Sequence, residues 1–185
     1  QTWIEHRGGQ ALWDELYRPR GLRGLLAGNT GPSMGGWFRK PVNSLEDIRG
    51  LRIRVAGMGG EVYAALGAVP QNIPPGDIFS ALERGTIDAV ELLAPVNDLP
   101  MGFERHAPYY YMPGFNKPNG AGEALISLAA FAKLPADLQS IVENACQAEH
   151  AAALAESEHM NASAILELAG KGAKVSQFPA DVLKA

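Results

Sequence analysis

The alternation of apolar and polar positions in the middle of the chain predicts a parallel sheet. Residues 51–55 alternate between aliphatic residues and arginines, as in a strand with one apolar face, and a glycine-rich turn then opens into a short helix that ends at Gly67. The order of strand and helix is repeated over residues 69–85, and residues 86–94 form a third apolar run. Strands and helices that alternate with such short connections favour parallel pairing with right-handed crossovers. The predicted fold class is therefore α/β.

The region before this sheet is predicted to contain a helix, two strands and a turn. Leucine and tryptophan at helical spacing predict a helix over residues 9–17. Residues 22–27 have the apolar character of a strand, and the turn-forming residues 28–32 follow them. A second strand over residues 35–40 carries two adjacent aromatic residues on opposite faces, so either both pack in the core or one faces a ligand cleft. These two residues are Trp37 and Phe38.

Two polar side chains are placed to start short helices. Ser44 and Asp47 have the spacing of a capping box, in which each side chain binds the other residue's backbone N–H. Asp77 follows a break of two prolines and a glycine, and it precedes the apolar positions of the next helix. We therefore expect helix starts at both places.

The second half of the chain differs from the first in its distribution of proline and glycine. Residues 95–122 contain five prolines, which predicts a long irregular connection with one helical turn near residues 101–105. Residues 123–131 read as a strand. Residues 135–168 contain neither glycine nor further proline after the first position, which predicts one helix of about 50 Å. Such a helix braces two lobes or meets another subunit, and residues 178–181 begin a further helix.

The composition excludes several classes of function. The 185 residues are 46% hydrophobic, which suffices for one ordinary domain or two small lobes. The 16 basic and 20 acidic residues are mixed along the sequence, so a nucleic-acid partner is not expected. The single cysteine, Cys146, rules out an internal disulfide, and no apolar run approaches the ~20 residues of a membrane span. Because the chain begins with Gln1, we expect it to be processed or truncated.

Motifs for catalysis fail in detail. Gly57, Gly59 and Gly60 suggest a dinucleotide-binding turn, but Val62 stands where the third glycine of that motif belongs. Ser33 lies in a G-x-S-x-G sequence, yet it leads from a proline turn into a strand, unlike a nucleophilic serine between strand and helix. The four histidines lack metal-ligand spacing. No catalytic set remains.

One arginine and one glutamate remain as candidates for ligand binding. Arg54 lies near the carboxyl end of its strand, where α/β sheets bind ligands and where the next helix offers N–H groups to an anion. Its position alone also fits an arginine on a solvated face. Glu91 ends an apolar strand on the same rim and needs a cation or several donors once buried. Glu91 therefore forms either an ion pair with Arg54 or part of a hard-cation site.

Four stretches of the sequence carry a family resemblance: residues 28–38, 45–60, 76–89 and 95–114. In this order they resemble the DctP-type solute-binding proteins of TRAP transporters, most of all the branch that binds 2-oxo and 2-hydroxy monocarboxylates with a cation. The resemblance covers nearly the whole chain. It implies a periplasmic receptor of two α/β lobes without enzymatic activity, which closes over an organic acid and delivers it to a sodium-driven membrane permease.

The resemblance also implies a substrate site. Arg54 matches the arginine that clamps the substrate carboxylate, Asn29 lies in the matching polar turn, and Asn97 falls in the loop beyond the sheet. The expected substrate-binding residues are Arg54, Asn29, Trp37, Phe38, Leu92 and Asn97.

A cation site, for sodium or calcium, is implied at Glu91, which matches the metal-binding acid of the family. Two departures weaken it. Ser33 replaces a glutamine and is short enough to need a bridging water, and Leu92 replaces a tryptophan, so that it offers its backbone carbonyl but no aromatic wall. The expected metal ligands are Glu91, Ser33 and Leu92, and these departures leave open a ligand other than pyruvate or lactate.

The chain is expected to hold only part of such a receptor, because family members have a whole lobe before the position of Gln1 and more helix after Ala185. A piece of this kind should be poorly stable alone or should dimerise, with the long helix as the contact. The expected segments are a helix leading into a hinge (1–21), the second ligand-binding lobe (22–100), a crossing loop with a return strand (101–134), the bracing helix (135–169) and a truncated C-terminal segment (170–185).

Two other interpretations remain open from the sequence. One is a Rossmann-like oxidoreductase that uses the glycine turn at Gly57. The other is a noncatalytic sensor lobe whose long helix pairs with a partner.

Overall fold

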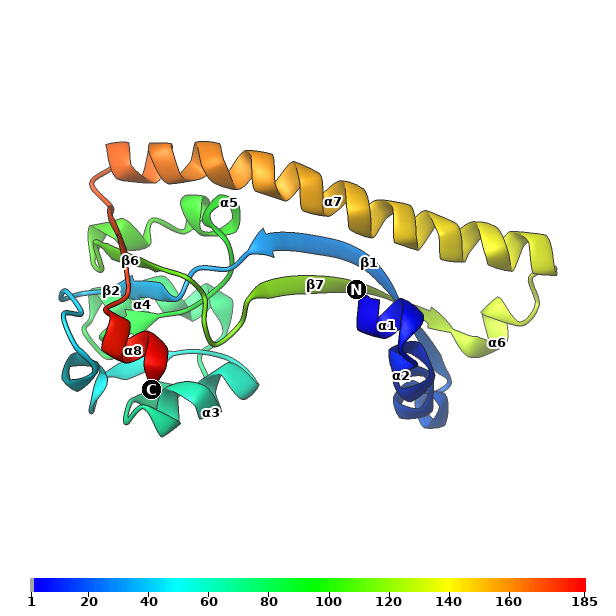
Figure 1. The fold of residues 1–185 in the computed structure, drawn as a ribbon, viewed down its shortest axis with the longest axis horizontal. Coiled ribbons are helices and arrows are strands. Elements are labelled where there is room, and N and C mark those ends of the chain that lie inside the picture. Colours follow the sequence, from blue (N-terminus) through cyan, green and yellow to red (C-terminus); the bar gives the residue numbers. More distant parts are fainter. Residues whose placement is uncertain (1) are drawn as a thin grey trace. The chain divides into compact units, whose positions relative to one another are not determined.

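A computed structural model describes residues 2–185, which form two compact units (Figure 1). The first unit comprises the chain up to Asn29 together with Ala121–Glu156. The second comprises Thr30–Gly120 and Ser157–Ala185. The polypeptide therefore passes from one unit to the other three times.

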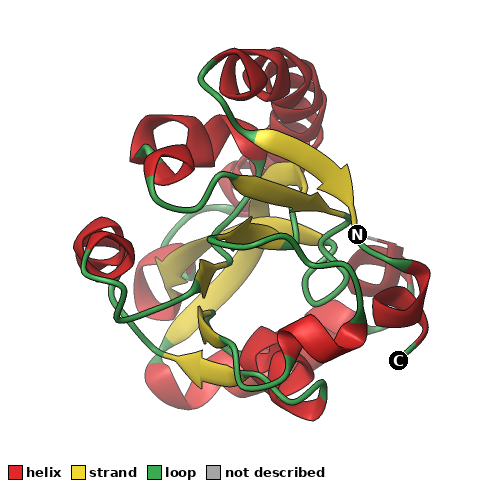
Figure 2. Cartoon of the chain, turned by 90° about the vertical axis from the view of Figure 1, so that its left-hand side faces the viewer, coloured by secondary structure: helices red, strands yellow, loops and turns green. Residues whose placement is uncertain are grey.

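The second unit is built on a six-stranded sheet in the order β4-β3-β5-β2-β6-β8. Strand β3 pairs in parallel with β4 and β5, and β6 pairs in parallel with β8, whereas β2 is antiparallel to both of its neighbours. Figure 2 shows these strands among helices, as expected for an α/β fold. The strands are β2 (Gly36–Phe38), β3 (Arg52–Arg54), β4 (Val69–Gln71), β5 (Ala89–Val90), β6 (Tyr109–Met112) and β8 (Lys174–Gln177).

The predicted order of strands and helices is confirmed at the centre of this sheet. Helix α3 (Met58–Ala65) joins β3 to β4, and α4 (Ile78–Glu83) joins β4 to β5. Ser44 and Asp47 form the predicted capping box, although the element that they start is the 3-10 helix η2 (Leu45–Ile48). The helix start expected at Asp77 is confirmed, since Asp77 directly precedes α4, but its side chain makes no capping hydrogen bond; the 3-10 turn η3 (Pro75–Asp77) leads into the helix.

The stretch predicted to be irregular, 95–122, is more ordered than expected. It begins with α5 (Pro95–Asp98), η4 (Leu99–Met101) and η5 (Phe103–Arg105), continues through β6 and ends in the first residues of β7. Four residues between prolines give no periodic signal, so β6 was missed, as was its parallel partner β8. After β8 the chain turns into α8 (Ala180–Lys184), where the sequence predicts a helix start.

Trp37 and Phe38 both pack in the core, which settles the alternative left open by their pattern. They face opposite sides of β2 and are 0% and 1% exposed. Trp37 stacks on Tyr110 with ring centroids 3.7 Å apart, and Phe38 meets Tyr111 edge to face. The adjacent tyrosines of β6 therefore pack in two separate core clusters, one on each side of the sheet.

A two-stranded sheet of β1 (Leu22–Pro32) and β7 (Asn119–Ser127) corrects two expectations. The residues 28–32 continue the strand instead of forming a turn, because glycines allow close pairing: a Cβ on Gly122 would lie 3.2 Å from the Cα of Gly28. The run 123–131 is only in part a strand, since its last four residues form helix α6 (Leu128–Phe131). The other helices of the first unit are α1 (Thr2–His6), which the sequence did not indicate, α2 (Gly9–Tyr17) as predicted, and η1 (Arg18–Arg20).

The long helix is confirmed as α7 (Ala136–Gly170), which starts directly after Pro135. Two of its polar side chains are buried and bind β1. In the first unit, Nδ1 of His150 lies 2.8 Å from the carbonyl oxygen of Gly28. In the second unit, Asn161 donates to the carbonyl of Thr30 at 3.1 Å and accepts from the N–H of Val96 at 3.0 Å. Across residues 2–185 we find no helix with the length and hydropathy that crossing a bilayer requires.

Candidate functional site

Arg54 is held at the end of β3 by two backbone carbonyls. Its Nε donates to the carbonyl of Ile73 at 3.0 Å, and its Nη1 donates to the carbonyl of Glu91 at 2.9 Å. Arg54 is only 6% exposed, and burial lowers its pKa while the nearby Glu91 carboxylate opposes this effect. Guanidinium remains charged at neutral pH in spite of such a shift. Within residues 2–185 its third nitrogen, Nη2, has no hydrogen-bond partner.

Glu91 pairs with a lysine that the sequence analysis did not select. Nζ of Lys117 lies 2.8 Å from Oε1 of Glu91, and it also donates to the carbonyl of Leu92 at 2.6 Å. Glu91 is 2% exposed. Burial raises the pKa of its carboxyl group, whereas Lys117 and then Arg54 act to lower it. The expected alternative of a direct Glu91 to Arg54 ion pair is therefore wrong: Arg54 binds the backbone of Glu91, and Lys117 takes its carboxylate.

A tight loop brings Lys117 to this position. The N–H of Ser33 donates to the carbonyl of Pro118 at 3.0 Å, and the N–H of Gly114 donates to the carbonyl of Ser33 at 2.9 Å. A Cβ on Gly114 would lie 2.6 Å from that same Ser33 oxygen, so only glycine allows this approach. Ser33 is 3% exposed, and its Oγ has no hydrogen-bond partner among the described residues.

Asn116 is a second polar residue in this loop without a partner. Both its Oδ1 and its Nδ2 are buried and make no hydrogen bond to the residues that the structure describes. Its Nδ2 would lie 2.8 Å from a Cβ added to Gly59, in the first turn of α3. A buried amide without hydrogen bonds lowers the stability of a folded protein. Such a group is therefore typical of a position that binds a ligand or water.

Asp98 is a buried carboxylate that accepts three hydrogen bonds. It accepts hydrogen bonds from Nε1 of Trp37 at 2.9 Å, from the hydroxyl of Tyr110 at 2.8 Å and from the N–H of Leu93 at 3.3 Å. Burial raises the pKa of Asp98 to about 6, although these donors act to lower it. Trp37 is thus oriented by Asp98 instead of lining an open surface.

The raised pKa of Asp98 predicts a pH-dependent difference in stability. The folded state holds the proton more tightly than the unfolded chain, whose pKa is 3.8, so stability from this group increases as the pH falls through about 6. Between neutral pH and about pH 4, the free energy of unfolding of the wild-type protein should rise by about 2 to 3 kcal/mol relative to that of Asp98→Asn. Urea unfolding of both proteins across this range measures the difference. Parallel pH profiles would contradict the prediction.

The structure brings together some, but not all, of the residues that the sequence predicted for the site. Arg54, Glu91, Leu92 and Ser33 lie in one network in the second unit. Asn97 is in α5 of the same unit, with a buried Oδ1 that has no partner among residues 2–185. Trp37 and Phe38 are core residues of the second unit, and Asn29 belongs to the first, where its amide lies 3.5 Å from Nε2 of His150.

Lys117 and Asn116 were missed because they lie 25 or more positions from the acid that they approach. The one available signal was the proline-rich loop, which marks functional connections without pointing to a residue. Among residues 2–185, no group of three or more histidine, cysteine, aspartate or glutamate side chains is placed to hold a metal ion.

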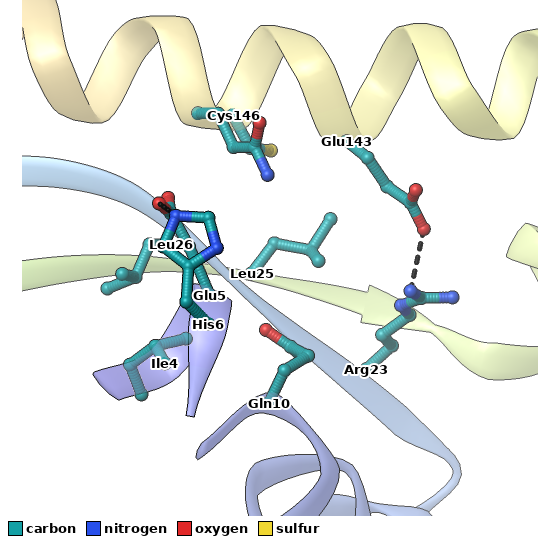
Figure 3. A pocket seen from close by; sticks show the side chains of 10 residues that line it. Ile4, Glu5, His6, Gln10, Arg23, Leu25, Leu26, Glu143 and Cys146 are labelled. Atoms are coloured by element: carbon teal, nitrogen blue, oxygen red, sulfur yellow. Dashed lines mark hydrogen bonds and ion pairs between the residues drawn. The ribbon is translucent and has the colours of Figure 1, made fainter. Parts of the chain in front are cut away.

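A separate cavity of about 250 Å³ lies in the first unit (Figure 3). Polar side chains of α1, α2 and α7 surround it, and Arg23 and Glu143 form an ion pair of 2.6 Å at one side. None of the site residues predicted from the sequence lines this cavity. It is distinct from the network around Arg54.

Comparison with known proteins agrees with the resemblance seen in the sequence. A monocarboxylate 2-oxoacid-binding periplasmic protein of Nostoc sp. is 34% identical, and the match covers 100% of this chain and 50% of that protein. A TRAP transporter solute-binding protein from Bordetella bronchiseptica, solved as a dimer with calcium and picolinate, is 42% identical with a TM-score of 0.91, covering 99% of this chain and 55% of that one.

A periplasmic TRAP protein from Pseudoalteromonas atlantica, solved with sodium and pyruvate, is 40% identical with a TM-score of 0.88. The match covers 99% of this chain and 56% of that one. The chain thus spans about half the length of these relatives. These matches favour solute binding over the oxidoreductase and sensor interpretations. The model of the DctP family, bacterial extracellular solute-binding protein family 7, matches residues 2–185. The chain therefore belongs to the DctP family of solute-binding proteins.

Proposed function

We propose that this chain is part of a periplasmic TRAP receptor that binds a small organic acid, a 2-oxo or 2-hydroxy monocarboxylate, through Arg54. The observation that carries the proposal is the guanidinium itself, which is 6% exposed, tied to two carbonyls and left with Nη2 unbonded among the described residues. A buried arginine with spare donors binds a planar carboxylate well.

Because the chain spans about half the length of its relatives, we propose that it supplies only part of the ligand site. The Thr30–Gly120 and Ser157–Ala185 unit serves as one ligand-binding lobe, and a second lobe closes over the acid. Asn97 and the backbone of Leu92 contribute polar contacts at this site. Trp37 and Phe38 form the packed floor that keeps the strand ends in place.

A positive charge beside Glu91 is a further part of the proposed site. In two relatives this type of protein was solved with calcium or sodium together with an organic acid. We place the corresponding charge at Glu91, the carbonyl of Leu92 and Ser33. The loaded receptor then delivers its acid to a sodium-driven permease, and α7 is the proposed contact for a homodimer.

Binding of a panel of acids to the intact protein tests the proposal. We expect isothermal titration calorimetry to detect pyruvate and other 2-oxo or 2-hydroxy monocarboxylates, and to detect no binding of NAD or of neutral analogues in which an amide replaces the carboxylate. Binding of the amides with equal affinity would contradict the role of the carboxylate. Binding of no acid in the panel would overturn the proposed function.

A further inference from the structure

The oxygens expected to bind a cation are already occupied by a side chain. Nζ of Lys117 lies 2.8 Å from Oε1 of Glu91 and 2.6 Å from the carbonyl oxygen of Leu92. These are two of the three ligands that the sequence analysis assigned to a metal ion. The Lys117 ammonium therefore sits where a bound ion would need to be.

The loop holds Lys117 in this position from both sides. Its N–H donates to the carbonyl of Gly114 at 3.1 Å, and Gly114 and Pro118 are each hydrogen-bonded to the backbone of Ser33. The Lys117 ammonium has three N–H donors; it donates one to Leu92 and forms an ion pair with Glu91, which leaves a donor for another acceptor. The lysine side chain is one-third exposed, so this last donor has access to a ligand.

With Lys117 in place, the remaining oxygens do not fit a resident metal ion. Calcium takes about six to eight oxygen ligands at roughly 2.3–2.6 Å. This part of the chain offers one carboxylate and otherwise only neutral oxygens, namely the carbonyl of Leu92, the short Ser33 hydroxyl and the side-chain oxygens of Asn97 and Asn116, and residues 2–185 contain no cluster of three acidic, histidine or cysteine ligands. The charge of buried Glu91 is already compensated by a lysine at contact distance.

We propose that the Lys117 ammonium supplies the positive charge that calcium or sodium supplies in the relatives, so that this protein binds its organic acid without a metal ion. Lys117 donates its third N–H to an oxygen of the acid, while Arg54 holds the carboxylate. This inference rests on the proposed function for the acid, but its metal-free character has an independent readout.

Titration of the wild-type protein with pyruvate tests the metal-free character directly. After exhaustive chelation, in a sodium-free buffer, we expect pyruvate affinity within about 2-fold of that with added calcium or sodium chloride. Loss of binding on chelation, with recovery on adding either ion, would overturn the proposal. This measurement needs no variant and hence does not depend on how a substitution folds.

Variants of Lys117 test the role of the ammonium. Lys117→Ala should weaken metal-free pyruvate binding by about 10-fold or more, and calcium or sodium should restore part of the loss by binding the freed oxygens. Lys40→Ala, which removes an exposed lysine, is the matched control and should bind as the wild type does. Undiminished metal-free binding by Lys117→Ala would overturn the proposal. Circular dichroism checks that each variant is folded, and Lys117→Met, which keeps the length of the apolar stem, replaces the alanine variant if that one unfolds.

Calcium titration without any acid separates this inference from the proposed function. The wild-type protein should take up no calcium, and Lys117→Ala should bind about one ion in the same assay. This outcome supports the inference even if no acid in the panel binds. Calcium uptake by the wild type, or none by the variant, overturns it.

Discussion

Arg54→Ala in the intact protein is expected to weaken binding of monocarboxylates by about 100-fold or more, because hydrogen bonds between a buried arginine and a carboxylate account for roughly 2 to 5 kcal/mol. Arg54→Lys should lose nearly as much. A lysine carries its charge at a single nitrogen, so it cannot bind the carbonyls of Ile73 and Glu91 and also present two parallel donors to a carboxylate. Calorimetric titration of both variants with pyruvate provides the measurement.

Arg52→Ala is the control for this experiment. Arg52 belongs to the same strand, but its guanidinium is exposed and pairs with Asp88 at 2.7 Å. Its removal should change pyruvate affinity by less than about 2-fold, since exposed ion pairs contribute less than about 1 kcal/mol. Equal effects of the Arg52 and Arg54 substitutions would refute Arg54 as the specific anchor.

Gly36→Ala is expected to lower the free energy of unfolding by about 3 to 5 kcal/mol, the range of severe core substitutions. Gly36 has a φ of +133°, and a Cβ there would lie 2.7 Å from the carbonyl oxygen of Val90. Both the backbone conformation and the contact with a neighbouring strand therefore exclude a side chain. Chemical unfolding monitored by tryptophan fluorescence measures the change.

Gly76→Ala provides the comparison for Gly36. No atom lies within 4 Å of a Cβ at Gly76, and its backbone is not in the positive-φ region. This substitution should leave stability unchanged within about 0.5 kcal/mol or raise it slightly. Similar unfolding midpoints for the two variants would show that the contact with Val90 is easily relieved, contrary to our expectation.

Local sequence patterns predicted the elements whose signal lies within one segment. The alternation around Ile53 gave β3, the run without glycine gave α7, and Ser44 with Asp47 gave a capping box. Short strands such as β6 and β8 lack such a signal, because their pairing partner lies more than sixty residues away. The glycines of β1 predict a turn, whereas their role is to let β7 approach.

The site follows the same division between local and distant information. The sequence indicates Arg54 and Glu91 because they lie at the carboxyl ends of β3 and β5, and parallel strands align their carboxyl ends. Their actual bonds were not predictable in this way. Whether the carboxylate of Glu91 contacts an arginine, a metal ion or a lysine depends on the path of the loop after β6. The close approach of Gly114 to Ser33 fixes this path, and the spacing of residues in the sequence does not predict such a contact.

The two buried polar residues of α7 have a consequence for the rotation of that helix about its own axis. His150 and Asn161 are about three turns apart, so they lie on the same face. Several large apolar side chains of α7 are exposed, among them Ile141 and Leu166, so an apolar stripe alone does not fix which face points inward. A roll by one residue would turn the face by about 100° and leave both polar groups without their carbonyl partners. These hydrogen bonds, together with the buried Leu168, thus specify the rotational register of the longest element among the described residues.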